Sequence, residues 1–223
     1  FMIFEPGRRM ASCDNFTITV DGVSAHATQP ELGADALIGA ASILMNLQTF
    51  VSRNNSPLNP LVVTVGEMHA GTRFNIIANH AEMYGTVRTF EPAFRMSIEA
   101  QLKRIIENTA AALGLKAELK YEYYPSAVIN DDDLLTEVAQ KAAEKLYGPE
   151  ALKELPMAMG SEDFAYFADK IPAVFGFLGS RNEALGYTAS NHNGCYTVNE
   201  PVLVRGVALY AQFAADYLDA AKG

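Results

Sequence analysis

The stretch FTITVDGVSAHATQP (residues 16–30) decides the fold, because a strand, a turn and the start of a helix follow one another in it. Residues 16–20 alternate apolar and polar side chains, which is the pattern of a half-buried strand. The Asp21-Gly22 pair then forms a turn. A helix is expected from Pro30 to about Asn54, since apolar residues recur there at helical spacing. The predicted apolar stripe comprises Leu37, Ile38, Ala41, Leu44, Met45 and Val51.

The next segments repeat this alternation of strand and helix. Residues 61–65 are a β-branched run, residues 81–90 alternate again, and residues 116–124 form a further predicted strand. A second helix is expected from Pro92 to Gly114. Its predicted inward-facing residues are Ile98, Leu102, Ile105, Ile106, Thr109 and Leu113. The order strand, helix, strand, strand, helix, strand is the ferredoxin-like βαββαβ pattern. It predicts both helices on one face of a four-stranded antiparallel sheet.

The chain changes character after Pro125. A cap at residues 131–133 leads a predicted helix to about Leu146, short strands are expected near 155–157 and 173–178, and a last helix near 201–221. That alternation is typical of an α/β layer, to which residues 2–4 would also belong. We therefore expect a ferredoxin-like domain (14–125) inserted in an α/β domain (1–13 and 126–223). The strands of that α/β domain are too few for a free-standing fold, which predicts missing N-terminal sequence.

Composition excludes several classes of function. The formal net charge is -9, with 49% apolar and 19% charged residues, so a nucleic-acid partner is not expected. We also expect no membrane partner, because no apolar run reaches the length of a span; since no signal-peptide pattern is present either, the expected location is cytoplasmic. Cys13 and Cys195 are too few for a disulfide framework and are expected to be inert, buried thiols.

Each residue that could take part in catalysis or binding also has a structural interpretation. His26, among small residues, and His192, in the polar loop YTASNHNGCYTVNE, suit a functional site, yet a lone histidine is more often structural. In MGSEDFAYF, Gly160 and Ser161 offer free N–H groups and Glu162-Asp163 offers two carboxylates. A helix N-cap with acidic first-turn residues explains Ser161, Glu162 and Asp163 equally well. Two further candidates, Asn75 and Arg88, can also be a turn former and an outward-facing strand residue. His69 and His80 are expected to be structural or exposed.

Four segments together resemble one family of enzymes. They are GVSAHATQPELGADALIGAA, VVTVGEMHAGTRFNIIANHAEMYGTVRTF, MGSEDFAYF and NHNGCYTVNEPVLVRGVALYA, in this order. They resemble the dinuclear-metal amidohydrolases that include N-acyl-amino-acid amidohydrolases, hippurate hydrolase and auxin-conjugate hydrolases, relatives of the aminoacylase metallopeptidases. The resemblance covers essentially the whole chain.

The resemblance implies a fold and a set of roles. A ferredoxin-like lid domain, which usually dimerises, is inserted in a zinc-peptidase-like α/β catalytic domain. His26 matches the lid histidine that stabilises the oxyanion in the partner subunit's active site. Asn75 and Arg88 match residues that hold the carboxylate end of the substrate. His192 matches a metal ligand, and Gly160, Ser161 and Glu162 match a loop that lines the pocket.

The chain departs from the family pattern in what it lacks. The family's other metal ligands and its general base, a glutamate of a Glu-Glu pair, lie on an N-terminal segment; this sequence contains neither that pair nor a His-x-Cys or Cys-x-His loop. Ala78 also stands where the family commonly has proline. We therefore expect the chain to be the C-terminal portion of an enzyme whose N-terminal part is absent. We expect this portion to be inactive by itself. The complete enzyme would hold two divalent ions, zinc, manganese, cobalt or nickel.

The expected function is metal-dependent hydrolysis of the amide bond in N-acyl amino acids or similar small conjugates, by a homodimer that pairs through its lid. In the complete enzyme, a metal-bound water activated by a glutamate would attack the acyl carbon. Two alternatives stay open. One is a di- or tripeptidase or carboxypeptidase of the same fold. The other is a non-catalytic, ferredoxin-like dimerisation module.

Overall fold

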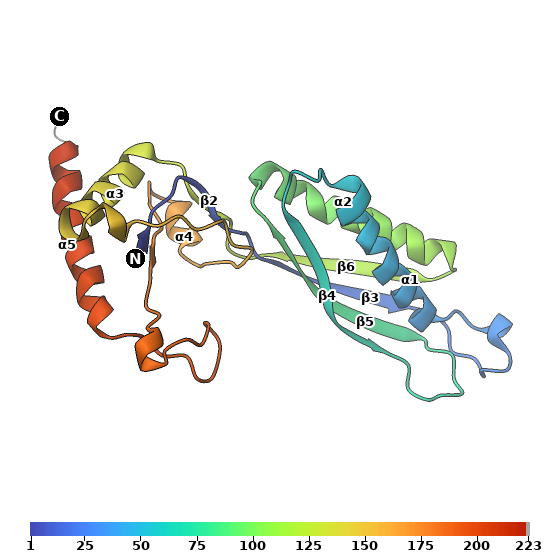
Figure 1. Cartoon of the computed structure of the whole chain (residues 1–223). Coiled ribbons are helices and arrows are strands. Elements are labelled where there is room, and N and C mark those ends of the chain that lie inside the picture. The colour runs from blue at the N-terminus through green and yellow to red at the C-terminus, as the bar shows by residue number, and fades with distance from the viewer. Residues whose placement is uncertain (222–223) are drawn as a thin grey trace. The chain divides into compact units, whose positions relative to one another are not determined.

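The computed structural model describes residues 1–221, and the chain divides into two compact units (Figure 1). The sheet unit comprises residues 10–128 and 158–166. The helix unit comprises residues 1–9, 129–157 and 167–223. Each unit has its own secondary structure and is described by itself.

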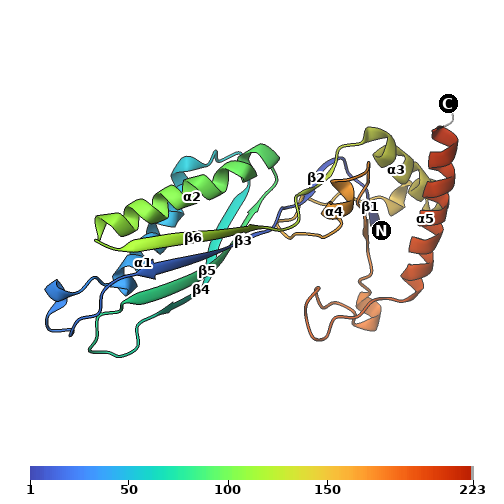
Figure 2. The ribbon, with the colours of Figure 1, turned by 180° about the vertical axis from the view of Figure 1, so that it is seen from behind.

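The sheet unit contains six main elements in the order that the sequence predicts. They are β3 (Asp14–Asp21), α1 (Ala36–Thr49), β4 (Leu61–Ala70), β5 (His80–Thr89), α2 (Pro92–Ala112) and β6 (Lys116–Tyr123). The strands form one sheet in the order β4-β5-β3-β6, and all neighbours are antiparallel. Both helices cover the same face of this sheet, as Figures 1 and 2 show. The mixed α/β architecture is therefore as predicted.

The core of the sheet unit lies between the helices and the sheet. Alternate residues of β3, namely Asp14, Phe16, Ile18 and Val20, are buried. They face Ile98, Leu102 and Ile106 of α2, which are fully buried as predicted. Ile105 and Thr109 are half-buried, whereas Leu113 is 42% exposed, so its predicted inward position is wrong. Gly114, with a φ of 69°, follows α2 in the left-handed conformation that commonly ends a helix.

Helix α1 differs from the prediction in its start and its buried face. A 3-10 turn occupies Pro30–Leu32, and α1 begins only at Ala36, where the Asp35 side chain accepts hydrogen bonds from the N–H groups of Leu37 and Ile38. The predicted stripe is wrong in part, because Leu37, Ile38 and Met45 are 42%, 52% and 69% exposed, whereas Leu44 and Val51 are half-buried against the core. The buried positions of the helix are Ala36, Gly39, Ala40, Ile43 and Leu47. Small residues there allow close packing against the sheet, since a Cβ on Gly39 would lie 3.3 Å from Val20 Cγ1 of β3 and 2.2 Å from Leu115 Cδ1, just before β6.

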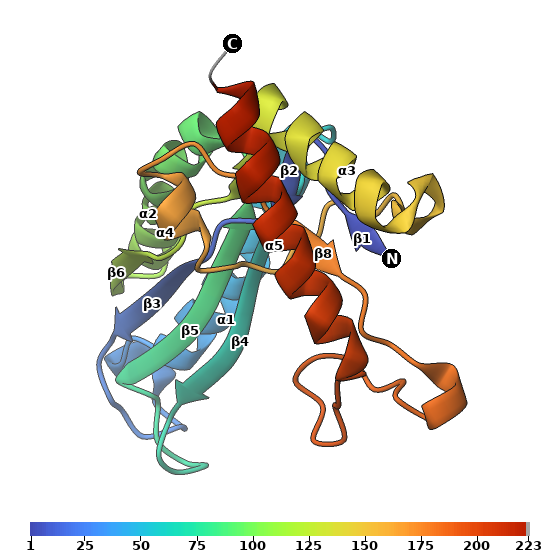
Figure 3. The same cartoon turned by 90° about the vertical axis from the view of Figure 1, so that its left-hand side faces the viewer.

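The helix unit contains two long helices and a short strand pair. β1 (Met2–Ile3) pairs antiparallel with β8 (Phe177–Leu178). α3 (Asp133–Tyr147) begins after its predicted cap, where Asp132 accepts from the N–H of Leu135. α3 packs against α5 (Pro201–Ala220), and Figure 3 shows both helices. Lys145 pairs with Asp216 of α5 at 2.9 Å.

Two sequence predictions for the remaining segments are wrong or incomplete. Residues 155–157 form no strand. β2 (Gly7–Met10) and β7 (Val128–Asn130) form a further two-stranded sheet that the sequence did not predict. Among the described residues, no helix has both the length and the apolar character that crossing a membrane requires.

Candidate functional site

The loop that carries His26 leaves the sheet at the end of β3. The N–H of Gly22 donates to the carbonyl of Asn79 at 2.9 Å, and Val23 and Ala34 exchange two backbone hydrogen bonds of 2.9 Å. A Cβ on Gly22 would lie 2.1 Å from the carbonyl oxygen of Ala34, so only glycine fits this close approach. The loop therefore returns tightly on itself before α1 begins.

We predict that Gly22→Ala opens this loop and destabilises the sheet unit by about 1–3 kcal/mol, because the added methyl overlaps backbone that cannot move aside without breaking the Val23–Ala34 pair. The measurement is hydrogen exchange of the Val23 and Ala34 amides, together with urea unfolding. Gly66→Ala is the matched control, since a Cβ there meets no atom within 4 Å. Unchanged protection of Val23 and Ala34 in the Gly22 variant would contradict the prediction.

His26 and Asn75 are brought together by backbone pairing between two loops. Ala27 donates its N–H to the carbonyl of Asn75 at 3.0 Å, and Ile77 donates to Ala25 at 2.9 Å. His26 thus forms an isolated antiparallel bridge with Ile76. The His26 ring is exposed, and its Nδ1 lies 2.8 Å from Thr28 Oγ1. Two residues of the predicted site therefore lie on adjoining loops that their main chains hold together.

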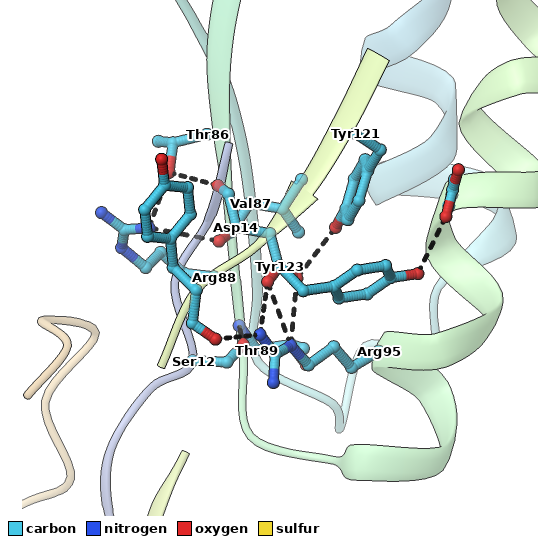
Figure 4. A network of polar contacts seen from close by, with 11 residues as sticks. Ser12, Asp14, Thr86, Val87, Arg88, Thr89, Arg95, Tyr121 and Tyr123 are labelled. Carbon is cyan, nitrogen blue, oxygen red and sulfur yellow. Dashed lines mark hydrogen bonds and ion pairs between the residues drawn. The ribbon is translucent and has the colours of Figure 1, made fainter. Parts of the chain in front are cut away.

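Arg88 lies on β5, on the sheet face away from α1 and α2. Its Nη1 donates to Thr86 Oγ1 at 2.6 Å and to the carbonyl of Val87 at 3.3 Å, and the Thr86 hydroxyl donates to the backbone carbonyl of Asp14 at 2.8 Å (Figure 4). In the described part of the chain, no acceptor engages Nε or Nη2 of Arg88. A guanidinium held on one side and free on the other suits a carboxylate ligand.

A buried ion pair joins the first residue of β3 to helix α2. The Asp14 side chain is fully buried, and Arg95 of α2 donates to it from Nε at 3.1 Å and from Nη2 at 2.5 Å (Figure 4). Tyr121 donates its hydroxyl to the same carboxylate at 2.9 Å. Burial, and then the neighbouring Asp14 charge, raises the pKa of Tyr121 above its usual range, so this hydroxyl stays a donor. The network fixes the end of the sheet at which Arg88 lies.

The loop of Gly160, Ser161 and Glu162 is attached near this end of the sheet. Ala11 donates its N–H to the carbonyls of Ala158 and Gly160, at 3.1 and 2.8 Å, and Ser12 donates to the carbonyl of Thr89, the residue after Arg88. Ser161 does not cap a helix, because α4 (Ala165–Ala168) begins four residues later. The N-cap interpretation is therefore wrong for Ser161, whereas the carbonyls of Glu162 and Asp163 accept hydrogen bonds from the N–H groups of Ala165 and Tyr166 at the start of α4.

The structure separates the predicted site residues of the sheet unit into two groups. The strand register pairs Asp21 with His80 at one end and Asp14 with Val87 at the other, seven residues away. At about 3.3 Å per residue, the two ends lie roughly 23 Å apart. Figures 1 and 2 show the loops before α1 and after β4 projecting from the first end. His26 and Asn75 belong to that end and Arg88 to the other, so one copy of the unit does not bring them together.

His192 lies in an exposed loop of the helix unit and has a φ of 65°. Within residues 1–221, no three His, Cys, Asp or Glu side chains lie close enough together to hold a metal ion. Because a metal site needs several such ligands, the residues present do not fit a dinuclear centre by themselves.

The remaining histidines and cysteines lie apart from these groups. His69 and His80 are 66% and 48% exposed and pair with Glu67 and Asp21, which agrees with the structural interpretation. The hydrogen bond to Asp21 raises the pKa of His80 above its usual value. Cys13 is half-buried, whereas Cys195 is exposed, so the prediction that both are buried is wrong.

Comparison with known proteins shows the family. Residues 8–216 match peptidase family M20/M25/M40, and the chain belongs to this family. It is 35% identical over 216 residues to N-acetylcysteine deacetylase of Bacillus subtilis (strain 168), covering 97% of this chain and 55% of that protein. It is 36% identical over 224 residues to an IAA-amino acid hydrolase of Arabidopsis thaliana, covering 97% and 50%. These relatives confirm the family that the sequence motifs indicate.

A solved structure shows the same architecture. The Bacillus subtilis YXEP protein, described as a dinuclear metal binding peptidase of the M20 family, superposes with a TM-score of 0.79 at 29% identity. The match covers 98% of this chain and 53% of that one. The chain thus spans about half the length of the relatives it matches.

Proposed function

We propose that this protein is the lid-bearing portion of a metal-dependent amidohydrolase that cleaves the amide bond of N-acyl amino acids or similar small conjugates. The observation that carries the proposal is the match over 97% of the chain to a deacetylase of N-acetylcysteine and to a hydrolase of IAA-amino acids. Both named substrates are amino acids with an acylated nitrogen. Such a substrate presents an amide to cleave and a free carboxylate to recognise.

We assign the lid to residues 14–125, as a ferredoxin-like domain inserted in a catalytic domain made of residues 1–13 and 126–223. The strand order β4-β5-β3-β6, with both helices on one face, supports this assignment. Two loops project from one end of the lid, while Arg88 and the Gly160 loop lie at its other end. Each end thus offers a different part of a substrate site.

The proposed roles follow from the chemistry of each side chain. Arg88 binds the substrate carboxylate with the donors that Thr86 leaves free, and Asn75 supplies an amide to the same end of the substrate. His26 donates a hydrogen bond to the oxygen of the acyl group as negative charge develops on it. Gly160, Ser161 and Glu162 line the pocket beside Arg88. These roles assign recognition of the carboxylate to Arg88 and Asn75, and charge stabilisation to His26.

We propose that the site is completed between two copies of the chain. The roughly 23 Å between the ends of the sheet prevents His26 and Asn75 from serving the same substrate as Arg88 of their own lid. A two-fold dimer that pairs through the lids removes this difficulty, because each copy then presents its loops to the other copy's arginine. Light scattering of the protein from its native cells should give twice the mass that mass spectrometry finds for a single polypeptide of the same sample.

We propose His192 as one ligand of a centre of two divalent ions, zinc, manganese, cobalt or nickel. The relative described as a dinuclear metal binding peptidase supports this proposal. The other ligands and the general base would come from residues outside these 223, so we expect this chain to be inactive by itself. We keep the cytoplasm as its proposed location.

The experiment that tests the proposal uses protein captured from its native cells, with its intact mass recorded and a divalent metal supplied. We expect a mass well above 24.2 kDa and hydrolysis of an N-acetyl amino acid. The methyl ester of the same substrate should react with a kcat/KM roughly ten- to hundred-fold lower, since it offers Arg88 no charged partner.

Other outcomes of this experiment favour the alternatives. Faster cleavage of dipeptides than of N-acetyl amino acids would favour a peptidase, a class to which the dinuclear relative belongs. If neither substrate is hydrolysed and the mass is near 24.2 kDa, the proposed enzymatic function is contradicted and the dimerisation module is favoured.

A further inference from the structure

The two nitrogens of the His26 ring have different surroundings. The backbone N–H of Thr28 donates to Nδ1 at 3.3 Å, and the Thr28 hydroxyl lies 2.8 Å from the same atom. A backbone amide can only donate, so Nδ1 accepts and carries no proton in this arrangement. The proton of the neutral ring is then on Nε2. No group in the described part of the chain engages Nε2.

We propose that Thr28 is a positioning residue that holds His26 as the Nε2–H tautomer, with the proton on the outward nitrogen. The inference rests on the proposed role of His26. An oxyanion needs a hydrogen-bond donor, whereas the other tautomer would present a lone pair to it. Two contacts from one residue, its N–H and its hydroxyl, select the tautomer before any substrate arrives.

Hydrogen bonds hold the backbone around His26, so rotation of the imidazole ring is the main freedom that remains. Residues 25 and 27 are hydrogen-bonded to residues 77 and 75 on the facing loop, and the N–H of Gln29 donates to the His26 carbonyl at 2.8 Å. Thr28 is β-branched, so its own side chain has few rotamers and aims its hydroxyl consistently. The contact with Nδ1 therefore acts on the orientation and tautomer of the ring, and the loop is held by other bonds.

The contact adds little to the stability of the fold. His26 and Thr28 are both exposed and only two residues apart, and a solvent-exposed local hydrogen bond contributes little to unfolding. Removal of the Thr28 hydroxyl should thus alter the tautomer without loosening the loop. This difference separates a positioning role from a merely structural one.

The test is nitrogen NMR of the chain labelled with ¹⁵N-histidine, at a pH where the rings are neutral. The chain has four histidines, and the His26 signals are assigned by their absence in His26→Gln. We expect an unprotonated Nδ1 and a protonated Nε2 in the wild type. Thr28→Val, which keeps the shape and removes the hydroxyl, should change the tautomer ratio about five-fold, while Thr28→Ser restores it.

A control variant and kinetic measurements show whether the change is specific to Thr28 and whether it affects catalysis. Thr72→Val, at an exposed threonine of the facing loop, should leave the His26 signals unchanged, and hydrogen exchange of the Val23 amide should be the same in all variants. A protonated Nδ1 in the wild type, or no shift in Thr28→Val, would overturn the proposal. In the active protein, Thr28→Val should lower kcat about five-fold at unchanged KM. A tautomer shift with unchanged kcat would uphold the positioning by Thr28 and contradict the oxyanion role of His26.

Discussion

Replacing Asp14 by asparagine is expected to destabilise the sheet unit by about 3 kcal/mol, because Arg95 would keep its charge in a largely buried position without a carboxylate partner. The Asp14 side chain is fully buried and the Arg95 side chain 11% exposed. Hydrogen exchange of the buried β3 amides, at Phe16, Ile18 and Val20, measures this change within the unit itself. We expect their opening free energy to fall by the same amount.

Two further variants test whether the unpaired charge on Arg95 causes the loss of stability. Lys103→Gln breaks an exposed ion pair with Glu107 at 3.8 Å and should change stability by less than about 0.5 kcal/mol. The double variant Asp14→Asn with Arg95→Met should lose less than the sum of the single changes, because no unpaired charge remains. A loss under about 1 kcal/mol for Asp14→Asn, or strict additivity, would show that the ion pair does not fix this end of the sheet.

Replacing His26 by alanine in the active protein is expected to lower kcat by about two to three orders of magnitude, the effect of losing one oxyanion donor. KM should change little, since the donor acts on charge that develops in the transition state and not on the bound ground state. The measurement is steady-state kinetics on an N-acetyl amino acid with saturating divalent metal.

His69→Ala is the matched control for this loss. His69 is an exposed histidine of the same unit, paired with Glu67 and 66% exposed, and its removal should leave kcat unchanged. A His26→Ala protein within a factor of about two of the wild type would exclude His26 from charge stabilisation.

The order of strands and helices along the sheet unit was predictable, but the buried face of α1 was not. The alternating runs near residues 16–20 and 81–90 carry a period of two that only a strand explains. Helix α1 is apolar on most of its surface, so several stripes fit its sequence equally well. Tertiary packing selects the stripe with Gly39 and Ala40, where small side chains let the helix approach the sheet. Spacing alone cannot distinguish that face from the one with Leu37 and Met45.

The supporting residues of the candidate site were missed, although one left a signal. Asp14 falls on the same face of β3 as Phe16 and Ile18, and a carboxylate on a buried face requires a partner. That partner, Arg95, lies 81 residues away, and no local pattern identifies it. Thr86 and Thr28 look like ordinary polar residues in the sequence. Their contacts with Arg88 and His26 depend on side-chain geometry that only the fold provides.

The separation of the two groups of site residues also could not be read from motifs. Asn75 and Arg88 are 13 residues apart in the chain and match one stretch of the family pattern. The intervening strand carries them to opposite ends of the sheet, because β5 runs its whole length between them. The proposal that a second copy supplies the missing group follows from this geometry.

Complementation between two inactive variants tests that central proposal most directly. His26→Ala and Arg88→Ala proteins are each mixed with the other under conditions in which dimers exchange, and hydrolysis of an N-acetyl amino acid is measured. If each site takes His26 from one copy and Arg88 from the other, half of the dimers are mixed and each holds one intact site, so activity returns to about a quarter of the wild type. If both residues serve the site of their own copy, no mixed dimer holds an intact site. Activity that stays at the level of the separate variants would contradict the account.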